Sequence, residues 1–223
     1  MSIVKWTLSG GAALLFLGAS FASAQTSFDL NAGFGSAWDG ANSGGIDNAA
    51  SVNAFGSCTP NGGDPYCESL PSLHGFFLGF GGDLMLFKHL GVGFETNFQP
   101  SRQNYGPLSS RQMFYDANAI YAPIATKRAS LLLEGGIGGA RTSFAYTESG
   151  CVGTAVCSTT TEPVGDANHF QFHAGVAVQI FLTSHIFIKP EYDFHYAYGF
   201  TNQFGSNVVN EGLVWVGYNF GER

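Results

Sequence analysis

The sequence predicts an all-β fold, an eight-stranded antiparallel up-and-down barrel that spans a membrane as a transmembrane β-barrel. Three observations lead to this prediction. Eight segments alternate apolar and polar residues with the period of two that a strand imposes on its side chains. The connections between these segments are long and short in turn. Charged residues make up only 11% of the chain, against roughly 25% in typical soluble domains.

The segment 186–198, IFIKPEYDFHYAY, alternates most clearly. Ile188, Tyr192 and Phe194 fall on one face, and Lys189 and Asp193 fall on the other. A soluble sheet would bury the apolar face, whereas a membrane barrel turns this face to lipid and keeps the polar face in its lumen. Each predicted strand is long enough for the about 9–11 residues that cross a bilayer at a tilt. The predicted strands are 26–37, 74–87, 91–99, 111–123, 129–144, 169–181, 186–198 and 208–220.

The connections indicate which way the barrel is oriented. Three are short (88–90, 124–128 and 182–185), and the four that alternate with them are longer: 38–73, 100–110, 145–168 and 199–207. Outer-membrane barrels have short periplasmic turns and longer extracellular loops. With an even number of strands, both termini belong to the short-turn side. The long connections are rich in Gly, Ser, Asn and Thr, which suits surface loops.

The first residues have the features of a secretory signal peptide. Lys5 precedes an apolar stretch, and Ala22-Ser23-Ala24 provides a small-residue cleavage site before Gln25. The apolar run is shorter than the about 20 residues of a spanning helix. We therefore expect a signal peptide at 1–24 and one barrel domain at 25–223.

Extending the alternation to all eight strands predicts which charged side chains face the lumen. They comprise eight of the sixteen acids, one strong base and two histidines. Eight acids and one lysine cannot all be dry, ionised and paired, so some must be hydrated, hold a cation or keep a proton. We expect a polar network that satisfies itself, because side chains fill the interior of small barrels; a cation or proton path is the alternative. The predicted lumen residues are Asp29, Asp83, Glu95, Asp116, Glu134, His173, Lys189, Glu191, Asp193, His195 and Glu211.

Other chemistry is less well supported by the sequence. His173, Asp193 and His195 share one face of adjacent strands, but such a trio is more often a hydrogen-bonded network than a set of metal ligands. The glycine-rich run 135–139 has no following helix and so lacks the context of a dinucleotide fingerprint. No G-x-S-x-G elbow is present. We therefore predict no enzyme activity, no cofactor and no metal.

The four cysteines form two local pairs, Cys58 with Cys67 and Cys151 with Cys157, each within a predicted long loop. Secretion permits disulfides. Four cysteines allow three connectivities, and the short loops favour pairing within each local pair. Neither pair has the spacing or the nearby histidines of common zinc motifs. We predict two local disulfides.

Aromatic side chains dominate the predicted outer face, where those near strand ends would form the interfacial girdles of a membrane barrel. A lipocalin-like soluble barrel would instead place this face inside and the carboxylates outside. The predicted outward aromatics are Phe76, Phe80, Phe94, Phe98, Tyr115, Tyr121, Phe170, Phe172, Tyr192, Phe194, Tyr196, Tyr218 and Phe220.

Three stretches, LLLEGGIGGARTSF (131–144), IKPEYDF (188–194) and LVWVGYNF (213–220), resemble the small eight-stranded outer-membrane β-barrel family. The OmpA transmembrane domain and OmpX belong to this family. In the family, alternating apolar residues and a terminal aromatic in the last strand are read by the barrel-assembly machinery; Val214, Val216, Tyr218 and Phe220 match this signal. Gly221-Glu222-Arg223 follow Phe220, so the aromatic is not terminal here.

The resemblance implies a protein of the bacterial outer membrane whose partners are membrane lipid, the barrel-assembly machinery and periplasmic chaperones. The few basic residues, outnumbered by acids, argue against nucleic acid as a partner. We expect a structural or surface-interaction role carried by loops 38–73 and 145–168, with the surface ligand left open. A narrow cation-favouring channel through the acidic lumen is the alternative. A secreted lipocalin-like ligand carrier is a third, weaker hypothesis.

Overall fold

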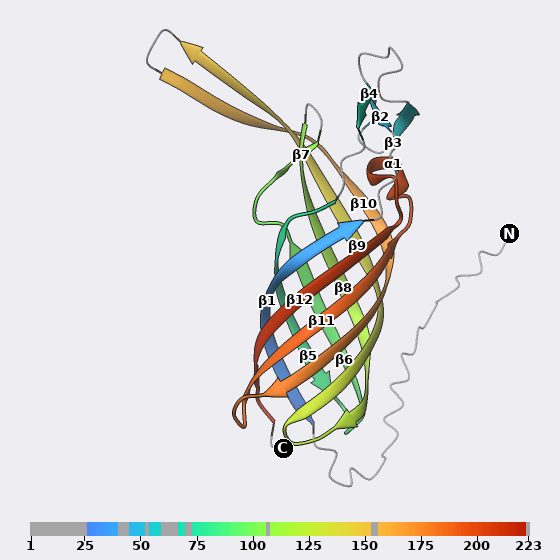
Figure 1. Ribbon diagram of the computed structural model, residues 1–223, viewed down its shortest axis with the longest axis vertical. Coiled ribbons are helices and arrows are strands. Elements are labelled where there is room, and N and C mark those ends of the chain that lie inside the picture. Colours follow the sequence, from blue (N-terminus) through green and yellow to red (C-terminus); the bar gives the residue numbers. More distant parts are fainter. Residues whose placement is uncertain are drawn as a thin grey trace, which may run out of the picture.

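The computed structural model describes residues 26–39, 45–51, 54–58, 67–69, 73–105, 108–152 and 156–221. Most of these residues lie in antiparallel strands, and eight of the strands close into a ring (Figure 1). This confirms the predicted barrel. The predicted signal peptide, 1–24, lies outside the described residues. The ring consists of β1 (Ser27–Asp39), β5 (Phe76–Met85), β6 (Leu90–Phe98), β8 (Leu108–Ala125), β9 (Ala129–Val152), β10 (Val156–Phe181), β11 (Ile186–Ala197) and β12 (Val208–Asn219).

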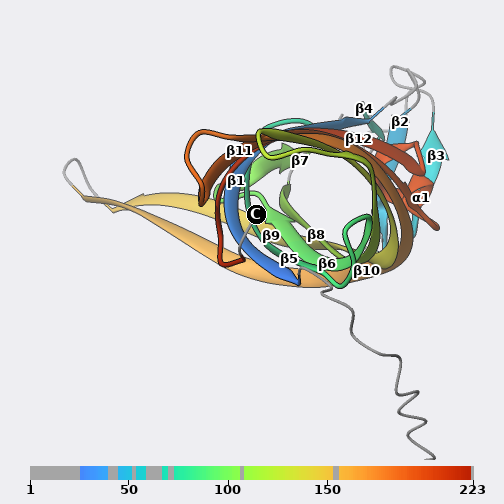
Figure 2. The same cartoon turned by 90° about the horizontal axis from the view of Figure 1, so that it is seen from below.

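The ring closes through the first and last strands. Each strand pairs with the strands that precede and follow it around the ring, and β1 pairs with both β5 and β12. Figure 2 shows the closed ring along its axis. A closed barrel satisfies its backbone hydrogen bonds between strands and leaves no sheet edge inside a bilayer. Among the described residues, no helix is both long and apolar enough to cross a membrane.

The side chains alternate across the wall as the sequence predicted. On β11, Asp193 and His195 are fully buried, whereas Tyr192 and Phe194 are exposed. Of the thirteen aromatics predicted to face outward, twelve are exposed and Phe98 is half-buried. Because the acids face inward and the aromatics outward, the structure excludes the lipocalin-like arrangement.

The two ends of the barrel differ (Figure 1). The short connections 86–89, 126–128 and 182–185 lie at the end where β1 begins and β12 ends. The longer connections lie at the opposite, extracellular end. They carry further structure where the sequence predicted only loops: β2 (Gly45–Ser51), β3 (Ala54–Cys58) and β4 (Cys67–Ser69) form a small sheet, β7 (Gln103–Tyr105) pairs with β8, and α1 (Thr201–Phe204) is a one-turn helix.

The prediction of a loop at 145–168 was wrong. β9 and β10 stay paired beyond the barrel, from Tyr146 opposite Glu162 to Val152 opposite Val156. One register shift, between Pro163 and Gly165, lies just before this stretch. The threonines at 159–161 contribute to the loop-like composition of this segment. Threonine is β-branched and suits strands, so an antiparallel partner of matching length keeps the segment extended.

The backbone brings one of the two predicted cysteine pairs directly together. Cys151 and Cys157 lie opposite each other on β9 and β10. Cys58 on β3 and Cys67 on β4 lie on either side of β2, opposite Gly45 and Asp47 respectively. Both disulfides stay predictions.

Candidate functional site in the barrel lumen

All eleven predicted lumen residues lie inside the barrel, and none is more than 6% exposed. Every strand of the ring contributes at least one of them from its inward face, and β11 contributes four. The buried charged side chains of the described interior comprise eight carboxylates and one lysine, besides the two histidines. Apart from Asp29, the residues form three groups that contact one another.

The group nearest the periplasmic end surrounds Lys189. Its Nζ lies 2.8 Å from Glu191 Oε2 and 3.4 Å from both Asp83 Oδ2 and Glu134 Oε1. The ammonium also lies 5.5 Å from the centre of the Trp215 ring, within cation–π range. One cation therefore holds three carboxylates from three other positions of the wall.

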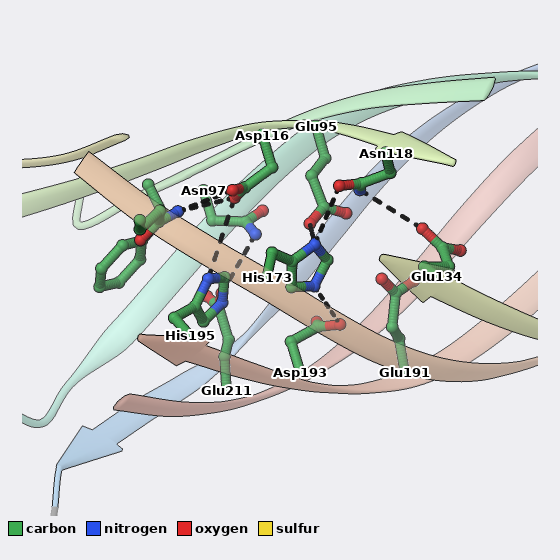
Figure 3. A network of polar contacts seen from close by, with 12 residues as sticks. Glu95, Asn97, Asp116, Asn118, Glu134, His173, Glu191, Asp193, His195 and Glu211 are labelled. Carbon is green, nitrogen blue, oxygen red and sulfur yellow. Dashed lines mark hydrogen bonds and ion pairs between the residues drawn. The ribbon is translucent and has the colours of Figure 1, made fainter. Parts of the chain in front are cut away.

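The middle group surrounds His173 (Figure 3). Its Nε2 lies 2.9 Å from Asp193 Oδ1, and its Nδ1 lies 3.0 Å from Asn118 Oδ1 and 3.5 Å from Glu95 Oε1. Asn118 Nδ2 donates to Glu134 Oε2 at 3.4 Å, which connects this group to the carboxylates around Lys189.

The third group surrounds His195, whose ring stacks on that of His173 with centroids 4.8 Å apart. His195 Nε2 lies 3.2 Å from Glu211 Oε2, and Nδ1 lies 3.9 Å from Asp116 Oδ2. Two amides complete the group: Gln171 Nε2 donates to both oxygens of Asp116 at 2.9 and 2.8 Å, and Asn97 Nδ2 donates to Glu211 Oε2 at 3.1 Å. His173, Asp193 and His195 do meet, as their shared face predicted.

The glycine-rich part of β9 makes room for this network. A Cβ on Gly138 would lie 1.9 Å from Tyr115 O and 2.5 Å from Asp116 Oδ1. Such contacts are shorter than real Cβ atoms show. The glycine-rich run 135–139 therefore serves to leave space for the buried Asp116 side chain, and not to bind phosphate.

The periplasmic end of the lumen contains a pocket lined by both polar and apolar residues. The pocket has a volume of about 480 Å³ and is lined by Asp29, Gln179, Met85, Lys88 and Lys127, among others. Asp29 accepts hydrogen bonds from Gln179 Nε2 at 2.7 Å and from Asn219 Nδ2. The predicted lumen residue nearest this end is thus held by two side-chain amides.

The extracellular mouth is filled by a buried apolar cluster that sequence reasoning missed. Phe77 and Phe114 stack with ring centroids 5.8 Å apart, and Phe200 and Phe204 stack at 4.6 Å. We call this cluster the apolar plug. It consists of Ala37, Leu73, Phe77, Tyr105, Phe114, Ala140, Phe144, Ala167, Ala197, Phe200, Phe204 and Val209.

Tyr105 links the parts of the plug that come from the connections. Its ring packs edge-on against Phe144 at 5.0 Å and Phe204 at 5.5 Å. Its hydroxyl donates to Gln203 O at 2.6 Å. Burial raises the pKa of the Tyr105 phenol, which keeps this donor protonated. β7 is thereby fixed to α1 across the mouth.

Comparison with known proteins supports the fold. No protein-family model matches the chain, and no curated protein does. Among solved structures, a major outer membrane protein of Thermus thermophilus is 13% identical with a TM-score of 0.50, over 87% of this chain and 99% of that one. Ail of Yersinia pestis, solved with the heparin analogue sucrose octasulfate, is 10% identical with a TM-score of 0.49, over 88% and 99%. The N-terminal barrel domain of Pseudomonas aeruginosa OprF is 13% identical with a TM-score of 0.44, over 88% and 99%.

The closed ring, the apolar outer face and the charged interior define an integral outer-membrane β-barrel protein. Its fold is that of the small eight-stranded outer-membrane barrels, of the OmpA transmembrane domain and OmpX type. The fold, the resemblance and the outer-membrane localisation predicted from the sequence are confirmed.

Proposed function

We propose that this protein is a non-conducting outer-membrane barrel with a structural or surface-interaction role, carried by its extracellular elements. The observation that carries the proposal is the apolar plug. It fills the extracellular mouth with buried aromatic rings. The small sheet of β2, β3 and β4 and the outer parts of β9 and β10 extend beyond the barrel at the same end (Figure 1). We therefore infer that partners bind the extracellular surface and that solutes do not pass through the barrel.

The largest extracellular element is the ribbon formed by the outer parts of β9 and β10. These strands are 24 and 26 residues long, more than twice the about 9–11 residues that cross a bilayer. Arg141 Nη2 pairs with Asp166 Oδ2 at 2.5 Å near the base of the ribbon. A two-stranded ribbon leaves the outer edge of each strand unpaired, and such edges can accept a further strand from a partner.

Shortening the ribbon tests this role. Replacing residues 148–160 by Asn-Gly would leave the pair Thr147–Thr161 as the last rung below a two-residue turn. Intact cells carrying the full chain or the shortened chain would be applied to arrays of glycans and matrix proteins. We expect a ligand that retains cells with the full chain and releases cells with the shortened chain. Equal retention of both strains on every ligand would contradict a role for the ribbon.

The remaining partners follow from assembly in the membrane. Val214, Val216 and Tyr218 face outward on β12, and the exposed Phe220 follows its end. This pattern supports recognition by the barrel-assembly machinery after delivery by periplasmic chaperones. Lipid is the partner of the outer face. We also infer that the protein is not an enzyme and binds no nucleic acid.

A cation-favouring channel is the second candidate, and the eight buried carboxylates favour it. An acidic lumen attracts cations and repels anions. Conduction would require the apolar plug to open, and the recordings described in the Discussion distinguish the two functions.

A further inference from the structure

We propose that the lumen binds one divalent transition-metal ion between Glu95, Asp116 and His173. This site is independent of the role proposed for the extracellular elements. It departs from the sequence-based expectation of no metal, and it rests on four observations about charge and geometry inside the barrel.

The first observation is that the described interior contains two groups of closely spaced ligand atoms. In one group these atoms belong to Glu95, Glu134 and Glu191; in the other they belong to Glu95, Asp116 and His173. Within each group, one ligand atom from each residue lies within 4.8 Å of the others, and all the residues are buried. Both groups therefore have the spacing that a shared cation would require.

The second observation is that only one of these groups has a cation of its own. Lys189 Nζ lies against Glu134 and Glu191, at 3.4 and 2.8 Å. Among the described residues, no lysine or arginine forms an ion pair with Glu95 or Asp116, whose ion-pair partners are His173 and His195. Buried charges need a partner of opposite sign. A bound ion would do for the second group what Lys189 does for the first.

The third observation is the orientation of His173. A metal-binding histidine typically donates its other ring N–H to a carboxylate, which fixes the tautomer and the ring. His173 Nε2 lies 2.9 Å from Asp193 Oδ1 in this way. Nδ1 faces Glu95 Oε1 at 3.5 Å, and a metal ion bound there would take the place of the hydrogen that Nδ1 shares with Asn118 Oδ1. Asn118 Oδ1, 3.0 Å from Nδ1, is a further oxygen at the same place.

The fourth observation is an unsatisfied nitrogen beside the site. His195 is fully buried, and its Nδ1 has no hydrogen-bond partner although it lies 3.9 Å from Asp116 Oδ2. Glu95 Oε1 is also buried without a hydrogen bond. Buried polar atoms are nearly always satisfied. His195 Nδ1 lies beside Asp116 and Glu95 Oε1 lies beside His173, so a positive ion between these residues would satisfy both atoms.

The ligand types narrow the choice of metal. One imidazole nitrogen with two carboxylate oxygens suits Zn²⁺ and its first-row neighbours, whereas Mg²⁺ and Ca²⁺ prefer oxygen ligands alone. Bonds of about 2.0–2.2 Å would draw the three side chains slightly inward. Water or Asn118 would complete the coordination.

The test uses the full barrel, unfolded with a chelator and folded into detergent with Zn²⁺. After gel filtration, elemental analysis should find about one zinc per chain, from the single site that the geometry forms. His173→Gln should lose it. Asp193→Asn, which keeps the ligands but weakens the carboxylate that orients His173, should lower affinity by about 10–100-fold. His185→Gln, at the periplasmic turn, is the matched control and should keep the ion; heat-modifiable gel mobility verifies that each variant folds.

Two outcomes would overturn the site. Absence of zinc from the folded parent protein would mean that the three side chains satisfy one another without an ion. Full occupancy in His173→Gln would place the ion elsewhere. X-ray absorption of the zinc-loaded parent keeps the proposal testable if that variant does not fold: one or two histidines with oxygen ligands support the site, and an environment with no histidine or with any sulfur rejects it.

Discussion

Trp215 fills the lumen at a level where the neighbouring strands carry glycine. Gly33 on β1 lies opposite Trp215 on one side and opposite Gly79 of β5 on the other. A Cβ on Gly33 would lie 2.6 Å from Trp215 Cε3, and one on Gly79 would lie 2.5 Å from Trp215 Cη2. The indole can cover both positions only because neither has a side chain.

Gly33→Ala should therefore destabilise the barrel. Overpacking a filled interior costs about 1–3 kcal/mol, and here the added methyl group meets a fully buried ring. The free energy of unfolding would be measured in urea with the barrel in lipid vesicles. Gly135→Ala is the matched control, because a Cβ at Gly135 has nothing within 4 Å. Equal midpoints for Gly33→Ala and Gly135→Ala would show that Trp215 moves aside freely.

The stability of the barrel interior should also depend on Lys189. Lys189→Met removes the ammonium group that pairs with Asp83, Glu134 and Glu191 while keeping a side chain of similar length. Removing one partner of a buried ion pair costs about 3–5 kcal/mol, and we expect a loss of that size in urea unfolding. Lys127→Met, in the exposed turn 126–128, should change little. An unshifted midpoint for Lys189→Met would mean that water already solvates the three carboxylates.

At the scale of elements, alternation and connection length suffice to predict the eight strands of the ring. A strand in this barrel has one face in lipid and one in a polar lumen. Successive residues must therefore be apolar and polar in turn, and this gives the sequence a clear period of two. Outside the membrane both faces meet water and the pattern is lost. For this reason the sequence predicted β9 only to 144, although the strand continues to Val152.

The ribbon allows a direct test of one disulfide. Directly opposite residues of antiparallel strands have Cα atoms about 4.5–5.5 Å apart, within the about 4.4–6.8 Å that a disulfide spans. Cys151 and Cys157 are such partners, so non-reducing peptide mapping should recover Cys151–Cys157. β2 lies between β3 and β4. The predicted Cys58–Cys67 bridge therefore requires these two strands to lie closer together than they do in this sheet. Recovery of a Cys58–Cys151 linkage would contradict both pairings.

At the scale of the whole molecule, the lumen and its apolar plug differ in how far the sequence could predict them. The inward acids follow from strand parity alone, because every second residue of a closed barrel faces inside. Phe77, Phe114 and Phe144 share this parity and carried the only available signal of the plug. Tyr105, Phe200 and Phe204 reach it from β7 and from the connection that holds α1, and the course of such segments has no sequence period.

The apolar plug should close the barrel to ions. Planar-bilayer recordings of the parent barrel should show no steady current, because rings from β5, β8 and α1 pack across the extracellular mouth. Phe200→Ser with Phe204→Ser removes two of these rings and leaves the barrel wall intact. We expect this double variant to pass small currents that favour cations, since the eight carboxylates below the plug give the lumen a negative potential.

Phe76→Ser with Phe80→Ser is the matched control, because both rings are exposed on the outer face and their loss should leave the barrel silent. Steady current through the parent barrel would contradict closure by the plug and favour the channel. Silence of the Phe200 and Phe204 variant would place the barrier deeper, in the polar network around His173 and Lys189. Preference for anions in that variant would contradict the inward carboxylates as the source of the lumen's field, because a narrow path lined by eight acids must attract the opposite charge.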